Sequence, residues 1–194
     1  MIHRGGTRFI ILICAIFYLL QHTYSPAVLE TLGLACIDNP KFNIIQLLSY
    51  GFLHGNTYHI CANIILIAIF GSRIQKVFGT WNFLMLFLIS VIGGGFVQTF
   101  TSDFDQVTIG ASGGVFGVML AFICLFPKER LGILLTPFSV PALWLVMGYI
   151  ITELYFILYS PVPNVAHYAH LGGAVTGLLF GMVWRKSLFM KNNP

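Results

Sequence analysis

Charged residues are scarce in this chain of 194 residues, because Asp, Glu, Lys and Arg together make up only 8% of it. Soluble domains carry about 25% charged residues. Hydrophobic residues reach 57%, and the mean hydropathy is +0.86. A surface that faces water cannot be built from this few charged residues. The composition therefore excludes a soluble protein and indicates an integral membrane protein. At this length we expect one domain, 1–194, formed mostly by membrane-spanning segments.

Short cysteine spacings of the kind that bind metals or cycle between thiol and disulfide are also lacking. Three of the four cysteines fall inside apolar runs, where a small side chain of low polarity packs well. No motif for a soluble cofactor is present, and the histidines lack a further ligand set at matching spacing. We therefore expect no cofactor and no metal. The four cysteines are Cys14, Cys36, Cys61 and Cys124.

Long apolar runs fill most of the sequence and predict an all-α membrane protein with six transmembrane helices. A helix needs roughly 20 residues to cross the hydrocarbon core, and the fourth run is short for this. A short helix is tolerated when it lies inside the bundle and starts in a water-accessible cavity. The first run resembles a signal peptide but lacks a clear cleavage site, so we expect it to be retained. The predicted helices cover residues 7–22, 58–77, 81–100, 112–127, 140–159 and 167–184.

The ten Lys and Arg residues are unevenly distributed around these segments. If six helices alternate in direction, nine of the ten lie on one side of the membrane and only Lys41 lies on the other. Positively charged loops stay in the cytoplasm, so we expect both termini there. The net charge of +4 therefore reflects topology, and we expect no nucleic-acid partner.

This topology brings three polar residues to one depth in the membrane. The second, fourth and sixth segments all run from outside to inside, and His59, Ser112 and His170 lie near their starts. A serine hydroxyl is a weak nucleophile that needs a base within hydrogen-bond reach. Histidine suits that role. The pattern predicts that helix packing brings Ser112 and His170 together.

Small residues indicate which two helices pack. Gly173, Gly177 and Gly181 recur every four residues along the sixth segment, and such a ridge lets another backbone approach closely. The fourth segment has glycines near its own start, so we expect these two helices to be in direct contact. The glycines of the fourth segment are Gly113, Gly114 and Gly117.

Acyl transfer also needs hydrogen-bond donors aimed at the developing oxyanion. The unpaired N–H groups at the start of the fourth helix, that of Ser112 included, can donate. His59 and Asn63 are four residues apart and share one helix face, and a buried amide such as Asn63 needs a partner. Taken singly, each motif has a plainer explanation in helix packing or interhelical hydrogen bonding. Their conjunction favours a hydrolytic site.

Over roughly 47–185 the chain resembles the rhomboid family of intramembrane serine proteases, in its six-helix bacterial form. The resemblance implies a rhomboid-like bundle with a Ser–His dyad that requires no carboxylate, in which Ser112 is the nucleophile and His170 the general base. The motifs that carry it are Phe52-Leu53-His54-Gly55-Asn56 with His59 and Asn63, Gly110-Ala111-Ser112-Gly113, and Ala169-His170-Leu171-Gly172-Gly173.

The same resemblance implies roles for the surrounding residues. His59, Asn63 and the Ser112 amide line an oxyanion hole, Gly110 lies beside the substrate, and Phe116 packs against the catalytic histidine. The implied partners are single-pass or multi-pass membrane-protein substrates, cleaved in or beside their transmembrane segments, and the lipid bilayer. The sequence departs from the family pattern at Ile45-Gln46 (often Trp-Arg), Gln75 (commonly Glu) and Phe116 (often Tyr).

Two further polar residues lie near the predicted site. His167 is one turn before His170 and competes as the base, but only His170 fits the Ala-His-x-x-Gly pattern. Glu153 is the only acid inside an apolar segment, and intramembrane carboxylates are candidates for function. For Glu153 we expect a structural hydrogen bond to Ser, Tyr or water rather than a catalytic role.

Two other classes of protein share part of this pattern. A catalytically inactive rhomboid-like protein would bind membrane segments without cutting them, but the presence of both Ser112 and His170 argues against it. A transporter would line a pathway with polar groups, but such folds typically consist of repeated halves, and no convincing internal repeat is present. The sequence identifies neither the natural substrate nor the oligomeric state.

Overall fold

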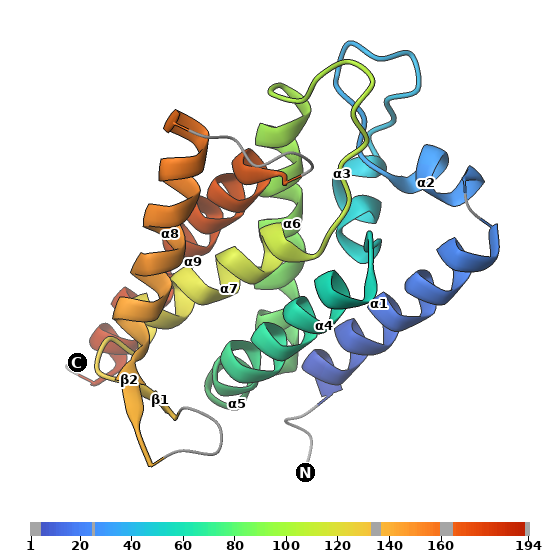
Figure 1. Ribbon diagram of the computed structural model, residues 1–194. Helices are drawn as coiled ribbons and strands as arrows, with labels where there is room; N and C mark the ends of the chain where they lie inside the picture. The colour runs from blue at the N-terminus through green and yellow to red at the C-terminus, as the bar shows by residue number, and fades with distance from the viewer. Residues whose placement is uncertain (1–4, 25, 133–136, 160–164, 193–194) are drawn as a thin grey trace.

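The computed structural model of the chain describes residues 5–24, 26–132, 137–159 and 165–192, which are mainly helical (Figure 1). One continuous rod combines α4, the π-helical turn η2 and α5. The elements in chain order are α1 (Gly5–Tyr24), α2 (Ala27–Leu32), α3 (Gln46–Ser49), η1 (Tyr50–Phe52), α4 (Thr57–Leu66), η2 (Ile67–Gly71), α5 (Ser72–Phe78), α6 (Thr80–Thr99), α7 (Ser112–Leu125), β1 (Arg130–Gly132), β2 (Ser139–Pro141), α8 (Ala142–Tyr159) and α9 (His167–Asn192).

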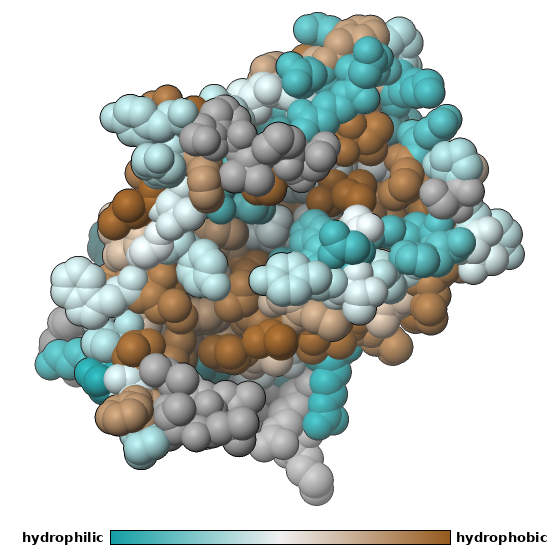
Figure 2. Space-filling model, in the orientation of Figure 1, coloured by the Kyte–Doolittle hydropathy of each residue, from teal (hydrophilic) through white to brown (hydrophobic). Residues whose placement is uncertain are grey.

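Four helical segments of the described chain are long and apolar enough to cross a membrane: α1, the rod Thr57–Phe78, α6 and α8. In Figure 2 hydrophobic residues cover much of the middle of the visible face, while hydrophilic residues gather toward the upper right. The prediction of an all-α membrane protein is confirmed. Because α7 is shorter and α9 is not among the four, the count of six crossings stays a prediction.

Helix α7 lies at the centre of the bundle. Eleven of its 14 residues are buried, and it has almost no exposed apolar face to present to lipid. A helix buried in this way does not need the full length of a membrane span. The prediction that the short fourth segment lies inside the protein is therefore confirmed.

Glycines bring α9 directly onto α7. A Cβ atom at Gly173 would overlap the carbonyl oxygen of Gly113, and one at Gly177 would overlap that of Gly117. Only a residue without a side chain permits this approach. The predicted contact between the fourth and sixth helices is confirmed, and α4, α7 and α9 all run toward the lower left in Figure 1.

The loop before α3 is held by one buried amide side chain. Gln46 Oε1 accepts the backbone N–H groups of Ala35 and Asn43, both at 3.3 Å. Its Nε2 donates to the carbonyl oxygens of Thr31 at 3.3 Å and Lys41 at 3.1 Å. Gln46 is 2% exposed, so this loop is anchored from within at a position where the sequence departs from the family pattern.

A second amide fixes the start of α4. The Gln21 side chain of α1 pairs with the His54 backbone, accepting its N–H at 2.9 Å and donating to its carbonyl oxygen. Two residues later, Asn56 Oδ1 accepts the backbone N–H of His59 at 2.8 Å and caps the helix. Such a cap satisfies one of the free donors of a helix start. The first turn of α4, and with it His59, is thereby held in place.

Two short strands lie at the other end of the bundle, and the prediction of a helix from residue 140 is wrong at its start, because Val140 and Pro141 belong to β2 and α8 begins at Ala142. β1 pairs with β2 in antiparallel register, with Leu131 opposite Val140. Nearby, Arg73 of α5 forms a half-exposed ion pair with Glu129 at 3.5 Å, and Gln75 Oε1 accepts the backbone N–H of Thr7 at 2.8 Å. Gln75, where the family commonly has Glu, thus ties α5 to α1.

Candidate active site

Ser112 and His170 meet where α7 and α9 begin. His170 Nε2 lies 2.7 Å from Ser112 Oγ, within hydrogen-bond distance. Ser112 is the first residue of α7, so its backbone N–H has no acceptor within the helix. His170 is 9% exposed. A hydroxyl and an imidazole at this distance can pass a proton from oxygen to nitrogen.

An aromatic ring covers one face of the imidazole. The rings of Phe116 and His170 stack with centroids 4.5 Å apart and an interplanar angle of 6°. Phe116 lies one turn after Ser112 and therefore on the same side of α7. The stack restricts how His170 can tilt while its Nε2 faces the serine.

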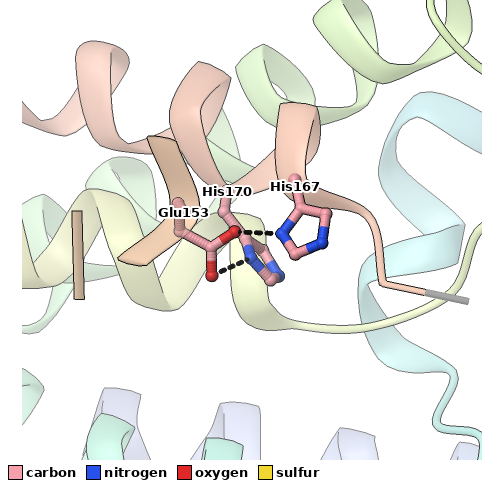
Figure 3. A group of neighbouring side chains, drawn as sticks. All are labelled: Glu153, His167 and His170. Carbon is pink, nitrogen blue, oxygen red and sulfur yellow. Dashed lines mark hydrogen bonds and ion pairs between the residues drawn. The ribbon is translucent and has the colours of Figure 1, made fainter. Parts of the chain in front are cut away.

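A carboxylate from a third helix faces the Nδ1 atom at the edge of the imidazole (Figure 3). Glu153 of α8 places Oε1 3.0 Å from His170 Nδ1 and Oε2 2.6 Å from His167 Nδ1. Glu153 is 8% exposed and His167 6% exposed. The expected hydrogen bond to Ser, Tyr or water is therefore wrong, because both carboxylate oxygens face histidines of α9.

His59 reaches the same region from α4. A Cβ atom at Gly110 would lie 2.8 Å from His59 Cε1 and 3.5 Å from Ser112 Oγ, so the histidine ring and the serine flank this glycine. Gly110 also has φ of +139°, a conformation that side-chain-bearing residues rarely adopt. The structure thus brings Gly110, His59 and Ser112 together at the start of α7.

Asn63 is a buried hydrogen-bond donor without an acceptor. It is 4% exposed, and its Nδ2 has no partner in the part of the chain that the structure describes. An unpaired buried donor is costly, so its presence calls for an explanation. Asn63 lies one turn after His59 on α4, and an acceptor supplied by a bound substrate would satisfy it.

Two residues outside the predicted set form buried hydrogen bonds near the start of α9. Gln98 at the end of α6 accepts the backbone N–H of Ala169 through Oε1 at 3.0 Å. The Tyr50 hydroxyl donates to the Val91 carbonyl at 2.9 Å. Gln98 is 3% exposed and Tyr50 1% exposed. The sequence contains one signal of the Gln98 contact, a glutamine in the last turn of a strongly apolar helix.

A cavity of about 460 Å³ opens beside the site. Its described lining includes His59 and Ala166, the residue just before α9, but neither Ser112 nor His170. It therefore lies at the edge of the Ser112–His170 pair. The other lining residues are Gly55, Asn56, Asp105, Gln106, Val107, Thr108 and Ile109.

The same carboxylate and its two histidines form the kind of donor set that zinc binds. Ligand atoms of Glu153, His167 and His170 all lie within 4.8 Å of one another. Sequence spacing does not reveal this set because Glu153 comes from a separate helix. In the structure, one carboxylate oxygen of Glu153 lies 2.6 Å from His167 Nδ1 and the other lies 3.0 Å from His170 Nδ1.

These features define a helical membrane protein with a serine–histidine pair between two glycine-packed helices. A family model described as "Rhomboid domain" matches residues 41–187. The chain belongs to the rhomboid family.

Relatives come from bacteria, plants and fungi. "Rhomboid protease GlpG" of Pectobacterium atrosepticum is 29% identical over 93% of this chain and 61% of its own length. "RHOMBOID-like protein 4" of Arabidopsis thaliana is 30% identical over 71% of this chain and 33% of its own. "Rhomboid protein 1, mitochondrial" of Saccharomyces cerevisiae is 28% identical over 74% of this chain and 43% of its own length. The chain thus spans less than two thirds of the length of these relatives.

Proposed function

We propose that this chain is a serine endopeptidase that cleaves transmembrane or juxtamembrane segments of other membrane proteins. The observation that carries the proposal is the 2.7 Å contact between Ser112 Oγ and His170 Nε2. Membership of the rhomboid family and similarity to a relative named as a protease support it. No cofactor is needed for this chemistry.

In the first half of the reaction Ser112 Oγ attacks the carbonyl carbon of the scissile peptide bond while its proton passes to His170 Nε2. The carbonyl electron pair moves onto oxygen, and the Ser112 N–H, Asn63 Nδ2 and His59 are the donors proposed to face it. Collapse of this intermediate breaks the C–N bond. The leaving amine takes the proton from His170, and an ester on Ser112 is left.

In the second half water replaces the amine. His170 Nε2 accepts a proton from the water as the water oxygen attacks the ester carbonyl. The C–O bond to Ser112 then breaks, and the serine oxygen recovers the proton from His170. The products are an amine and a carboxylic acid, and the enzyme returns to its starting state.

We also propose an orientation of the protein in the membrane. The distribution of Lys and Arg residues supports six crossings with both termini in the cytoplasm. The starts of α4, α7 and α9 then face the periplasmic half of a bacterial inner membrane, where the cavity beside His59 gives water a route to the site. Substrates are membrane proteins that reach the site from the bilayer.

A fluorescent transmembrane-segment substrate tests the proposal, with purified wild type compared with Ser112→Ala in detergent. Cleavage by wild type and none by Ser112→Ala is expected. Covalent labelling of Ser112 by a serine-directed phosphonate provides a readout that does not depend on substrate choice. A folded wild type that neither cleaves nor becomes labelled would overturn the proposal in favour of an inactive rhomboid-like protein that binds membrane segments.

A further inference from the structure

Glu153 is an exception on its helix. α8 buries only three residues, and the other two are Ala142 and Val146. A carboxylate in the hydrophobic part of a membrane protein is costly unless it is paired. Its two partners are His167 and the proposed general base, His170. The two histidines are therefore the groups that compensate for the cost of burying the Glu153 carboxylate.

The carboxylate determines which ring nitrogen of His170 carries the proton. An ionised carboxylate can only accept hydrogen bonds, and a neutral imidazole has one N–H donor and one acceptor nitrogen. With Glu153 Oε1 3.0 Å from Nδ1, the proton belongs on Nδ1. The lone pair is then on Nε2, which faces the Ser112 hydroxyl at 2.7 Å. This is the form of His170 that can take the serine proton.

We propose that Glu153 is a positioning residue that keeps His170 in this form and stabilises the imidazolium created during the reaction, while His167 holds Glu153 in place. The inference rests on the proposed serine-protease function and adds a third member to the Ser112–His170 pair. When His170 takes the proton from Ser112, the new positive charge lies beside the negative carboxylate. Because the pair is buried, water screens this attraction little.

His167 fixes the second carboxylate oxygen. Its Nδ1 lies 2.6 Å from Glu153 Oε2, so the carboxylate cannot rotate without losing this bond. The His170 Nδ1 contact is less well aligned, since Nδ1 has no linear hydrogen bond among the described residues despite the 3.0 Å separation. Catalytic hydrogen bonds are often loose without substrate and tighten in the complex. Because the His167 contact holds the carboxylate in place, Glu153 Oε1 stays close enough to His170 Nδ1 for their hydrogen bond to shorten when substrate binds.

The first test compares Glu153→Gln with Glu129→Gln, the same chemical change at a half-exposed ion pair. Glu153→Gln keeps the size of the side chain but removes the charge. We expect kcat to fall about 100-fold with KM nearly unchanged, and phosphonate labelling of Ser112 to slow in parallel. Glu129→Gln should behave as wild type. A wild-type kcat in Glu153→Gln, or a loss confined to KM with normal labelling, would overturn the proposal.

The second test concerns His167. In His167→Asn an amide N–H can replace Nδ1 as the donor to Glu153, whereas His167→Ala leaves no donor. We expect both variants to keep measurable activity, with His167→Asn the more active. Equal activity of the two variants and wild type would remove His167 from the proposal. Loss of all activity in His167→Ala, with activity kept in His170→Ala, would reassign the base and overturn it.

Two further measurements separate this inference from the proposed function. A strongly deshielded imidazole N–H proton of His170 is expected in the NMR spectra of wild type, Ser112→Ala and His167→Asn. Its absence from both Glu153→Gln and His170→Ala would assign it to the contact between His170 and Glu153. This signal does not require cleavage, and its absence from wild type would argue against the inference alone. Dialysis of wild type against EDTA should leave kcat unchanged. Loss of activity on dialysis would point to a metal on Glu153, His167 and His170 instead.

Discussion

The Phe116 ring lies parallel to the His170 ring, with 4.5 Å between their centroids. A parallel stack covers one face of the imidazole and leaves its edge free, so Nε2 can face Ser112 while Nδ1 faces Glu153. The same phenylalanine meets Tyr149 of α8 edge-on at 6.2 Å. Phe116 therefore links His170 of α9 to both α7 and α8.

Replacing Phe116 tests the importance of this stack. In Phe116→Leu the imidazole gains freedom to tilt, and we expect kcat to fall about tenfold because the proton transfer depends on orientation. Phe116→Tyr keeps the ring and should retain most activity. The control is Phe96→Leu, which removes an exposed aromatic ring of α6. Equal kcat values for Phe116→Leu and this control would show that the stack does not position His170.

Replacing Asn63 should lower activity without lowering stability. Asn63→Ala removes a proposed oxyanion donor, and loss of one such donor lowers kcat by about 100- to 1000-fold. Its Nδ2 has no hydrogen-bond partner among the described residues, so the variant breaks no internal bond of that atom. We therefore expect the free energy of unfolding to change little.

Asn82→Ala is the matched control, because Asn82 Nδ2 donates to the Phe78 carbonyl at 2.8 Å on an exposed part of α6. Cleavage rates and unfolding curves in the same detergent give both quantities for each variant. A normal kcat in Asn63→Ala would exclude Asn63 as an oxyanion donor, and a large loss of stability would give it a structural role instead.

The glycine pattern shows how far the sequence alone can predict this fold. Gly173 and Gly177 predict close packing of α9 because a repeated small residue has few other uses in an apolar helix. Their partners Gly113 and Gly117 are recognisable for the same reason. Once these two helices are paired, Ser112 and His170 must be near one another, so the central pair of the site follows from local patterns.

Glu153 shows where such prediction ends. Its sequence position indicates a buried acid, but helix α8 has no glycine ridge or other pattern that fixes its rotation against α9. Its contact with both His167 and His170 therefore depends on tertiary packing. Gln46 is similar, since three of its four backbone partners come from a loop with no periodic pattern and the fourth, Thr31, is in α2. These contacts required the three-dimensional structure.

Gly177 provides a prediction about stability. In Gly177→Ala the new methyl group meets the Gly117 backbone, which cannot move aside as a flexible side chain would. Overpacking of this kind costs about 1–3 kcal/mol. Separation of α7 from α9 also moves His170 from Ser112, so kcat should fall as well.

Gly148→Ala is the matched control for Gly177→Ala. Gly148 is a helical glycine of α8 with nothing within 4 Å of an added Cβ atom. Alanine favours helix by up to about 1 kcal/mol over glycine, so this variant should be slightly more stable and fully active. The free energies of unfolding in mixed micelles compare the two. If Gly177→Ala matched Gly148→Ala, the close contact of α7 and α9 would not contribute to stability.

His54 predicts a dependence of stability on pH. The pKa of His54 is lowered from 6.5 to about 4, first by burial and second by the nearby His59, while the Phe52 backbone acts in the opposite direction. The ring is 0% exposed, and neither ring nitrogen has a hydrogen-bond partner among the described residues. The native state therefore holds His54 neutral over a pH range in which the unfolded chain binds a proton.

The direction of the effect follows from this difference in proton binding. Above pH 6.5 both states are neutral at this residue and the full stability is present. As the pH falls from about 6.5 to about 4, the unfolded state gains a proton that the native state does not, so stability decreases. The total loss is about 3 kcal/mol, and below about pH 4 this contribution levels off because the native state is protonated as well.

His54→Gln should remove this part of the pH dependence, because glutamine does not titrate. His22→Gln is the control, since His22 is exposed on α1 with its Nδ1 2.9 Å from the Tyr18 carbonyl. Unfolding free energies measured at pH 7.5, 5.5 and 4.5 should decline in wild type and in His22→Gln, and decline less in His54→Gln. A decline of the same size in all three proteins would show that another group causes it. The His54 ring lies edge-on to the His59 ring, with 5.1 Å between the centroids. The result would therefore also show whether the residue next to His59, a proposed oxyanion donor, stays uncharged at acidic pH.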